Sequence, residues 1–179
     1  MQQNDLWVFG YGSLLWHPGF EFVERRVATL RGFNRSFCMS SIHYRGTTEA
    51  PGLVLALDPD HVAECHGVGF RVAPEMADET MDYLRERELI SAAYVEERHP
   101  ISFHEGGDAE AVCYVMDQNH HQYRGDLSIE DQAVIIADAV GSAGPNDEYL
   151  FNTVAHLIEL GISDPDLERL VALVKAAAG

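Results

Sequence analysis

The residues of this chain that could do chemistry fall in two places: a glycine-rich turn near the start and an acidic position at a helix end. A short apolar run, residues 7–9, is typical of a buried strand and is followed by Gly10, Tyr11, Gly12 and Ser13. Glycines at a strand end let the backbone turn sharply with its N–H groups exposed. The amides of residues 11–14 and the Ser13 hydroxyl could then bind a carboxylate or a polarised carbonyl oxygen.

This turn does not fit the common nucleotide-binding motifs. Leu15 stands where G-x-G-x-x-G requires its third glycine, and the expected acidic residue about twenty positions later in a βαβ unit is missing. The chain has no G-K-[ST] sequence, which excludes a phosphate loop. A plain tight turn after a core strand stays open as an alternative.

Glu88 is the second candidate, because the helical pattern of residues 75–88 calls for an apolar residue at its position. At about 3.6 residues per turn, the inward stripe consists of Ala77, Thr80, Met81, Leu84 and Glu88. The opposite, solvent face carries Glu79, Asp82 and Glu86. Burial raises the pKa of a carboxyl group, and a carboxyl tuned toward neutrality suits general acid–base catalysis. Alternatively, Glu88 lies past the helix end and pairs with Arg85 or Arg31.

Six blocks in a fixed order, spread over nearly the whole chain, together resemble the ChaC-like γ-glutamylcyclotransferases. They are 8–16 (VFGYGSLLW), 43–46 (HYRG), 51–54 (PGLV), 66–72 (HGVGFRV), 83–88 (YLRERE) and 144–150 (GPNDEYL). The resemblance implies a compact, mostly antiparallel barrel flanked by helices, and we expect a single domain over residues 1–179. Residues 89–94 depart from the short glycine-containing link that is usual in the family.

The resemblance also implies a reaction. Enzymes of this family cleave glutathione: the α-amine of the γ-glutamyl group attacks its own side-chain carbonyl, 5-oxoproline forms and cysteinylglycine leaves. Glu88 matches the position of the catalytic glutamate, and the reaction calls for no metal and no organic cofactor. The expected substrate-binding residues are Gly10, Tyr11, Gly12, Ser13, Leu14, Arg45 and Tyr149. Arg45 could equally form a surface ion pair, and Tyr149 could simply pack in a helix.

Two other functions stay open at this point. The leaving group could be another amino acid or an amine instead of cysteinylglycine. In a different class, the chain would be a non-catalytic protein whose pocket binds small anions or a protein partner. An inward Glu88 speaks against the second possibility, because a carboxylate beside an anion-binding turn would weaken binding.

The amino-acid composition indicates which classes of partner the protein can bind and in which cellular compartment it is expected. With 29 Asp and Glu against 12 Lys and Arg, the formal net charge is −17, which argues against nucleic acid and anionic membranes as partners. No apolar run is long enough to span a bilayer, and residues 1–5 lack the basic start of a signal peptide. Three scattered cysteines suggest reduced thiols in the cytoplasm. The nine histidines show no metal-ligand spacing, so no metal is expected. The sequence gives no oligomeric state.

The order of the elements favours an α+β fold, with strands first and a helical C-terminal third. The predicted strands are 6–11, 26–31, 34–41, 53–58, 64–72, 93–103 and 109–116. Glu105 to Asp108 predict a hairpin between the last two strands. After the helix at 75–88, Ser128 with Asp131, Pro145 with Asn146, and Asp164 with Pro165 are expected to open three further helices.

Overall fold

The computed structural model describes residues 5–89 and 93–178. Their contacts group into two compact units, one formed by Met1–Arg35 with Leu57–His120 and the other by Ser36–Ala56 with His121–Gly179. The expectation of a single domain over residues 1–179 stays a prediction. Residues 90–92, half of the segment 89–94 that departs from the family pattern, and residues 1–4, in the segment where no signal peptide is expected, lie outside the described residues.

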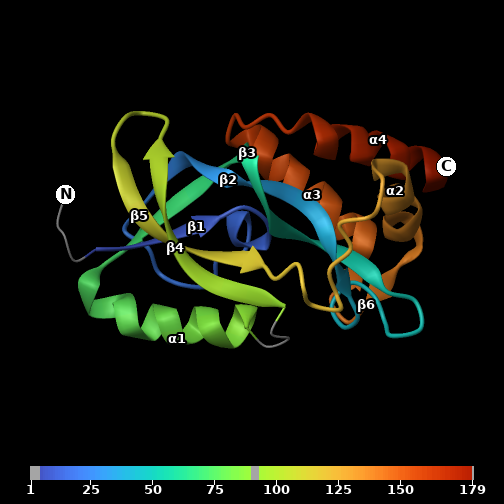
Figure 1. The fold of residues 1–179 in the computed structure, drawn as a ribbon, viewed down its shortest axis with the longest axis horizontal. Helices are drawn as coiled ribbons and strands as arrows, with labels where there is room; N and C mark the ends of the chain where they lie inside the picture. Colours follow the sequence, from blue (N-terminus) through green and yellow to red (C-terminus); the bar gives the residue numbers. More distant parts are fainter. Residues whose placement is uncertain (1–4, 90–92, 179) are drawn as a thin grey trace. The chain divides into compact units, whose positions relative to one another are not determined.

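Five strands close into a barrel in the order β1-β3-β2-β4-β5 (Figure 1). In the first unit, β1 runs antiparallel to β3, with Val8 opposite Phe70, and parallel to β5, with Val8 opposite Val112. The predicted mixed, mostly antiparallel barrel is therefore confirmed. The strands are β1 (Leu6–Gly10), β2 (Glu24–Ser41), β3 (Gly52–Val72), β4 (Tyr94–Phe103) and β5 (Asp108–Met116).

Two long strands replace two predicted pairs. The sequence predicts 26–31 and 34–41 as separate strands, but β2 is continuous from Glu24 to Ser41. The segments 53–58 and 64–72 likewise belong to one strand, β3. The predicted hairpin is confirmed: β4 and β5 pair from Tyr94 opposite Met116 to Ser102 opposite Asp108.

Helix α1 (Ala77–Glu88) packs on β1 and β5 in the first unit, after a 3-10 turn at Pro74–Met76. Figure 1 shows α1 running alongside the barrel strands. Met81 and Leu84 enter one apolar cluster with Val8, Val112 and Tyr114. Leu84 is 0% exposed, and burial of one such side chain contributes roughly 1.5–3 kcal/mol. This packing fixes the rotation of α1 about its axis, and hence the direction of Glu88.

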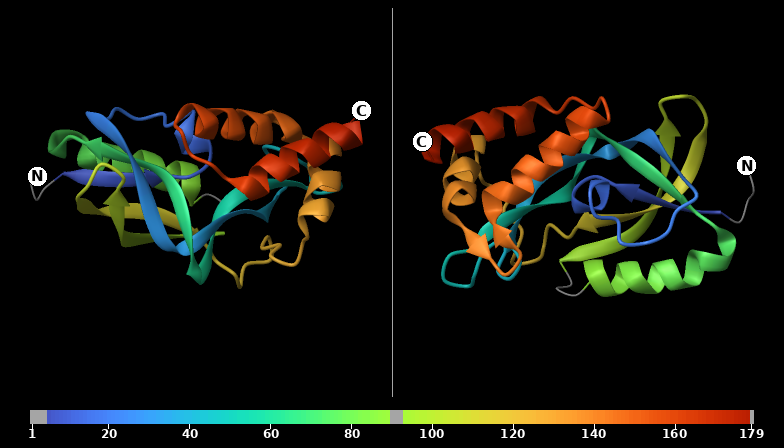
Figure 2. Two further views of the ribbon diagram at one scale, coloured as in Figure 1. Left: turned by 90° about the horizontal axis from the view of Figure 1, so that it is seen from above. Right: turned by 180° about the vertical axis from the view of Figure 1, so that it is seen from behind.

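The second unit contains α2 (Ile129–Asp138), α3 (Asn146–Glu159) and α4 (Pro165–Ala178), which pack on one another (Figure 2). Along the chain, α2 is connected to α3 by a two-stranded ribbon of β6 (Val140–Gly141) and β7 (Gly144–Pro145). The Ser128 hydroxyl accepts a hydrogen bond from the Asp131 amide at 3.1 Å, the expected cap of α2. The predicted helical C-terminal third is confirmed.

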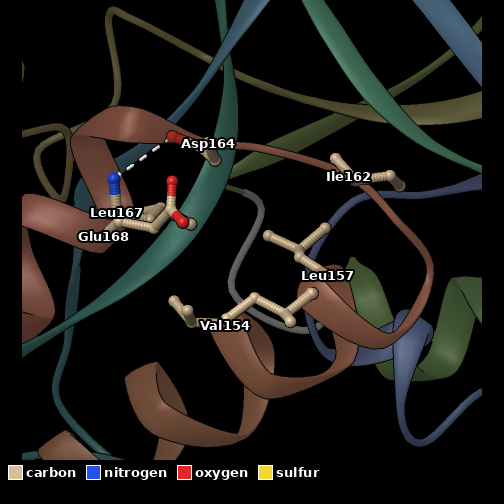
Figure 3. Close-up of a pocket in the computed structure, with 7 residues that line it drawn as sticks. Val154, Leu157, Ile162, Asp164, Leu167 and Glu168 are labelled. Carbon is tan, nitrogen blue, oxygen red and sulfur yellow. Dashed lines mark hydrogen bonds between the residues drawn. The ribbon is translucent and has the colours of Figure 1, made fainter.

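The start of α4 is also capped as the sequence predicts. The Leu167 amide donates to the Asp164 carboxylate at 3.1 Å (Figure 3). Beside this cap, Val154 and Leu157 of α3 face Ile162 and Leu167, and all four are buried. This apolar contact joins α3 to α4. None of the helices in the described residues has the length and apolar character needed to span a bilayer.

Candidate active site

Glu88 is the last residue of α1 and continues the buried face of that helix. Thr80, Met81 and Leu84 are buried on this face, and the Glu88 side chain is 14% exposed. Glu86, two positions earlier, is exposed to solvent. The predicted assignment of the two helix faces is confirmed.

The expected alternative, in which Glu88 lies past the helix end and pairs with Arg85 or Arg31, is wrong in its position and in its partners. Arg85 binds Glu96 with two hydrogen bonds of 3.0 and 3.1 Å, and Arg31 lies 3.7 Å from Glu64. The cation beside Glu88 is its neighbour Arg87, whose Nε lies 3.5 Å from the Glu88 Oε1 atom. Glu88 is thus a shielded carboxyl with one adjacent guanidinium.

Burial dominates the electrostatics of Glu88. Loss of hydration raises the pKa of its carboxyl group, and the positive charge of Arg87 acts in the opposite direction with a smaller effect. The negative charge of Glu88 in turn contributes to the raised pKa of Tyr114, after burial and the hydrogen bond that Tyr114 donates to Glu96 at 2.9 Å. A carboxyl group in this state is a stronger base than a solvated one and can carry a proton.

We expect Glu88→Gln to raise the free energy of unfolding at neutral pH. Because the folded state raises the Glu88 pKa, the wild type loses stability as the pH rises from the unfolded pKa through the folded one. At pH values below the unfolded pKa, about 4.3, both states hold a neutral carboxyl group and the two proteins should be alike. Urea denaturation between pH 4 and pH 8 measures the difference.

Glu86→Gln is the control for this stability change and should stay within about 0.5 kcal/mol of the wild type throughout, as surface substitutions do. A Glu88→Gln protein that is less stable than the wild type at pH 7 would show that the buried carboxylate is stabilised overall.

The loop after β1 begins at Gly10, where there is no room for a side chain. A Cβ atom on Gly10 would come within 2.9 Å of Phe70 and 3.2 Å of Leu14. Ser13–Leu15 then forms one 3-10 turn, in which the amide of Leu15 donates to the Gly12 carbonyl at 2.9 Å. The amides of Ser13 and Leu14 stand in the first turn, where N–H groups have no partner within the helix. They are therefore suitable donors for a substrate oxygen.

Arg87 links this loop to the end of α1. Its Nη2 atom donates to the Ser13 hydroxyl at 3.0 Å, and its Nη1 atom lies 2.6 Å from the His17 carbonyl and 3.0 Å from the Pro18 carbonyl. The Ser13 hydroxyl and the Glu88 carboxylate therefore share one guanidinium. No pattern in the sequence indicates this role of Arg87, because its partners lie about seventy residues earlier in the chain.

Arg35 holds the start of the same loop from another strand. Its side chain is buried, and its Nε atom donates to the Tyr11 carbonyl at 2.8 Å. Its Nη2 atom donates to the His66 carbonyl of β3. β2 carries four arginines, so the sequence does not distinguish Arg35 from the others or indicate its two carbonyl partners.

Arg45 and Tyr149 lie in the second unit and contact each other. The Arg45 guanidinium carbon is 5.7 Å from the centre of the Tyr149 ring, and its Nη1 donates to the Pro145 carbonyl at 3.0 Å. The Tyr149 hydroxyl accepts from the Leu55 amide at 3.3 Å. Both residues are buried, so Arg45 is no fully solvated surface cation, although it lies 3.5 Å from Glu148. Their binding role stays a prediction.

The described residues give little support for a cysteine nucleophile or for a metal site. Cys38, Cys65 and Cys113 are buried free thiols, and burial raises the pKa of Cys113 to about 12, which disfavours its thiolate. In the described ranges, no three His, Cys, Asp or Glu side chains are grouped to hold a metal ion. The expectation of no metal and no cofactor stays a prediction.

Comparison with known proteins assigns the chain to a family. The family model described as "ChaC-like protein" matches residues 6–177. The chain belongs to the ChaC-like family. The match includes the loop after β1, residues 11–18 (the 11–18 loop), and the end of α1. It confirms the resemblance that the ordered sequence blocks indicate.

Curated relatives of this ChaC-like chain come from bacteria, plants, animals and fungi. The glutathione-specific gamma-glutamylcyclotransferase of Escherichia coli strain K12 is 35% identical over 173 residues, which cover 97% of this chain and 74% of that protein. Gamma-glutamylcyclotransferase 2-3 of Arabidopsis thaliana is 33% identical, with coverage of 95% and 88%. A crystal structure of a yeast gamma-glutamylcyclotransferase specific to glutathione has a TM-score of 0.87 at 23% identity and 97% coverage of both chains, which confirms the fold.

Proposed function

We propose that this ChaC-like protein is a glutathione-specific γ-glutamylcyclotransferase, a lyase-type enzyme that converts glutathione to 5-oxoproline and cysteinylglycine. The relatives from Escherichia coli and, at 32% identity, from Homo sapiens carry that name and match 97% and 96% of this chain. The observation that carries the proposal is the shielded Glu88 carboxyl, joined through Arg87 to the loop that contains Ser13.

The reaction needs no nucleophile from the protein. The α-amine of the γ-glutamyl group attacks the γ-carbonyl carbon, a C–N bond closes the five-membered ring, and the C–N bond to cysteine breaks. Glu88, as a carboxylate, takes a proton from the α-ammonium, which frees the amine to attack, and delivers it to the leaving nitrogen. The ring nitrogen then gives up a second proton, which passes to the released amine, so that two protons leave one nitrogen, two reach the other and Glu88 ends as a carboxylate. The protein also holds the substrate folded, which places the amine and the carbonyl within reach of each other.

The loop after β1 supplies donors for the oxyanion that forms at the γ-carbonyl or for the α-carboxylate. The candidates are the main-chain amides of the segment Gly10, Tyr11, Gly12, Ser13 and Leu14, together with the Ser13 hydroxyl. Local donors of this kind are required, since the net charge of −17 repels an anionic substrate at long range. Arg45 and Tyr149 are proposed to bind the remainder of the peptide.

Ser13→Ala is expected to reduce kcat/KM for glutathione by only about 2- to 10-fold, the equivalent of one hydrogen bond. The loop amides remain in this variant, and only the hydroxyl that accepts from Arg87 is lost. Steady-state kinetics measure the change. Ser102→Ala is the matched control, because Ser102 accepts from an exposed arginine, Arg31, at 3.2 Å and should leave kcat/KM unchanged. A loss above about 1000-fold in Ser13→Ala would mean that the hydroxyl itself takes part in the chemistry.

Incubation of the purified protein with glutathione tests the proposal. We expect 5-oxoproline and cysteinylglycine in equal amounts, without added metal or cofactor. Turnover of other γ-glutamyl amino acids or amines, but not of glutathione, would favour the same ring closure with a different leaving group. No turnover of any γ-glutamyl compound would favour a non-catalytic protein that binds small anions or a partner.

The same reasoning extends to the location and partners of the enzyme. We propose a cytoplasmic protein whose main partner is its small substrate. Three free thiols and a strong negative charge support a reducing compartment and argue against nucleic acid and membrane surfaces as partners.

A further inference from the structure

The Arg87 side chain has more partners than a surface arginine needs. Its Nη1 atom lies within 3.1 Å of the His17 carbonyl, the Pro18 carbonyl and the Tyr83 hydroxyl, and its Nη2 atom donates to Ser13. Its Nε side faces the Glu88 carboxylate at 3.5 Å, and the side chain is only 19% exposed. The fork of five N–H groups is therefore directed at one loop, one hydroxyl of the same helix and one acid.

The end of the loop is shaped to receive this guanidinium. Pro18 is followed by Gly19 at φ 76°, a left-handed conformation that favours glycine. A Cβ atom at Gly19 would lie 1.9 Å from the Tyr83 hydroxyl. The chain thus passes directly over Tyr83, and the carbonyls of His17 and Pro18 are presented to Arg87, which satisfies both.

We propose that Arg87 is a positioning residue for the cyclotransfer: its guanidinium holds the 11–18 loop and the Glu88 carboxylate in one fixed arrangement. The inference rests on the proposed function and adds to it a residue that touches neither the reacting atoms nor the proton. The loop donors and the proton carrier must face the same substrate, and a displacement of about 1 Å between such groups can cost about 100-fold in rate.

Lysine cannot replace arginine in this role. A lysine ammonium is a compact point charge, whereas the planar guanidinium binds Ser13, the two loop carbonyls and Tyr83 at the same time. Lysine would keep a positive charge beside Glu88. Arg87→Lys and Arg87→Met therefore separate the charge from the geometry.

Kinetics of these variants test the proposal. In Arg87→Met we expect kcat to fall about 10- to 100-fold with a smaller change in KM. The acidic limb of the pH profile should move to higher pH, because the positive charge that lowers the Glu88 pKa is gone. In Arg87→Lys the limb should return toward the wild-type position while kcat stays low. Arg85→Met, on the same helix but bound to Glu96, is the control and should keep wild-type kcat.

Amide hydrogen exchange provides a readout that does not need activity. The amides of Leu15, Trp16 and His17 donate within the loop and should exchange faster in Arg87→Met but not in Arg85→Met. Unchanged exchange together with wild-type kcat in Arg87→Met would overturn the proposal, as would faster exchange with unchanged kcat. If the wild type failed to turn over glutathione, the proposed function would fall, and exchange alone would decide whether Arg87 holds the loop.

Discussion

Glu88→Gln is expected to lose turnover of glutathione by about 100- to 10,000-fold, the range that general acid–base catalysis contributes. The amide has nearly the shape of the carboxyl group but can neither take the proton of the ammonium nor deliver it to the leaving nitrogen. The fold should be intact, since the variant removes a buried charge whose desolvation raises its pKa. Release of cysteinylglycine under saturating glutathione measures the loss.

Glu86→Gln is the matched control, which tests whether the loss depends on the helix face that carries the carboxyl group. Glu86 carries the same carboxyl group two positions earlier on α1 but is exposed, and its variant should keep turnover within about twofold of the wild type, as remote surface changes do. Near-normal turnover in Glu88→Gln would reject Glu88 as the proton carrier. Equal damage in both variants would point instead to a general effect of charge on α1.

The sequence could predict the position of Glu88 but not that of its partner. Periodicity depends only on the helix itself, so the face that holds Leu84 and Glu88 follows from about 3.6 residues per turn. The role of Arg87 depends on a loop some seventy residues earlier in the chain, whose carbonyls its guanidinium reaches. No local pattern encodes such a contact, because backbone carbonyls are the same at every residue.

Dependence on distant residues also explains why the sequence predicted β3 as two separate strands. The segment around Asp58, Pro59 and Asp60 is polar and largely exposed, and its composition is typical of a turn. It is nevertheless part of β3, with Gln118 donating to the Asp58 carboxylate at 2.7 Å. Strand propensity reflects the neighbours that a strand finds in the fold more than its own residues. The helices of the second unit were predicted more closely, because caps such as Ser128 and Asp164 act within a few residues.

Asn146 shows how a polar residue can hold the second unit together. It is 0% exposed at the start of α3. Its Oδ1 atom accepts from the Leu53 amide at 2.8 Å, and its Nδ2 atom donates to the Leu53 carbonyl at 2.7 Å. One side chain therefore satisfies both backbone groups of a buried residue in β3. The sequence marked Asn146 only as the start of a helix within the 144–150 block.

We expect Asn146→Ala to lower the free energy of unfolding by about 2–4 kcal/mol, because each buried backbone group left without a partner costs about 1–3 kcal/mol. The shorter side chain also leaves space beside Leu53. Chemical denaturation at pH 7 measures the loss. Asn146→Asp keeps the acceptor for the Leu53 amide but loses the donor to its carbonyl, so it should also destabilise the fold.

Asn119→Ala is the matched control, because Asn119 is exposed in a turn and its removal should change stability by less than about 0.5 kcal/mol. A similar loss of unfolding free energy in both variants would mean that the two hydrogen bonds between Asn146 and Leu53 do not contribute specifically to stability. If Asn146→Ala were as stable as the wild type, another group would have to satisfy the Leu53 amide and carbonyl. Asn146 would then be a packing residue rather than the polar link between β3 and α3.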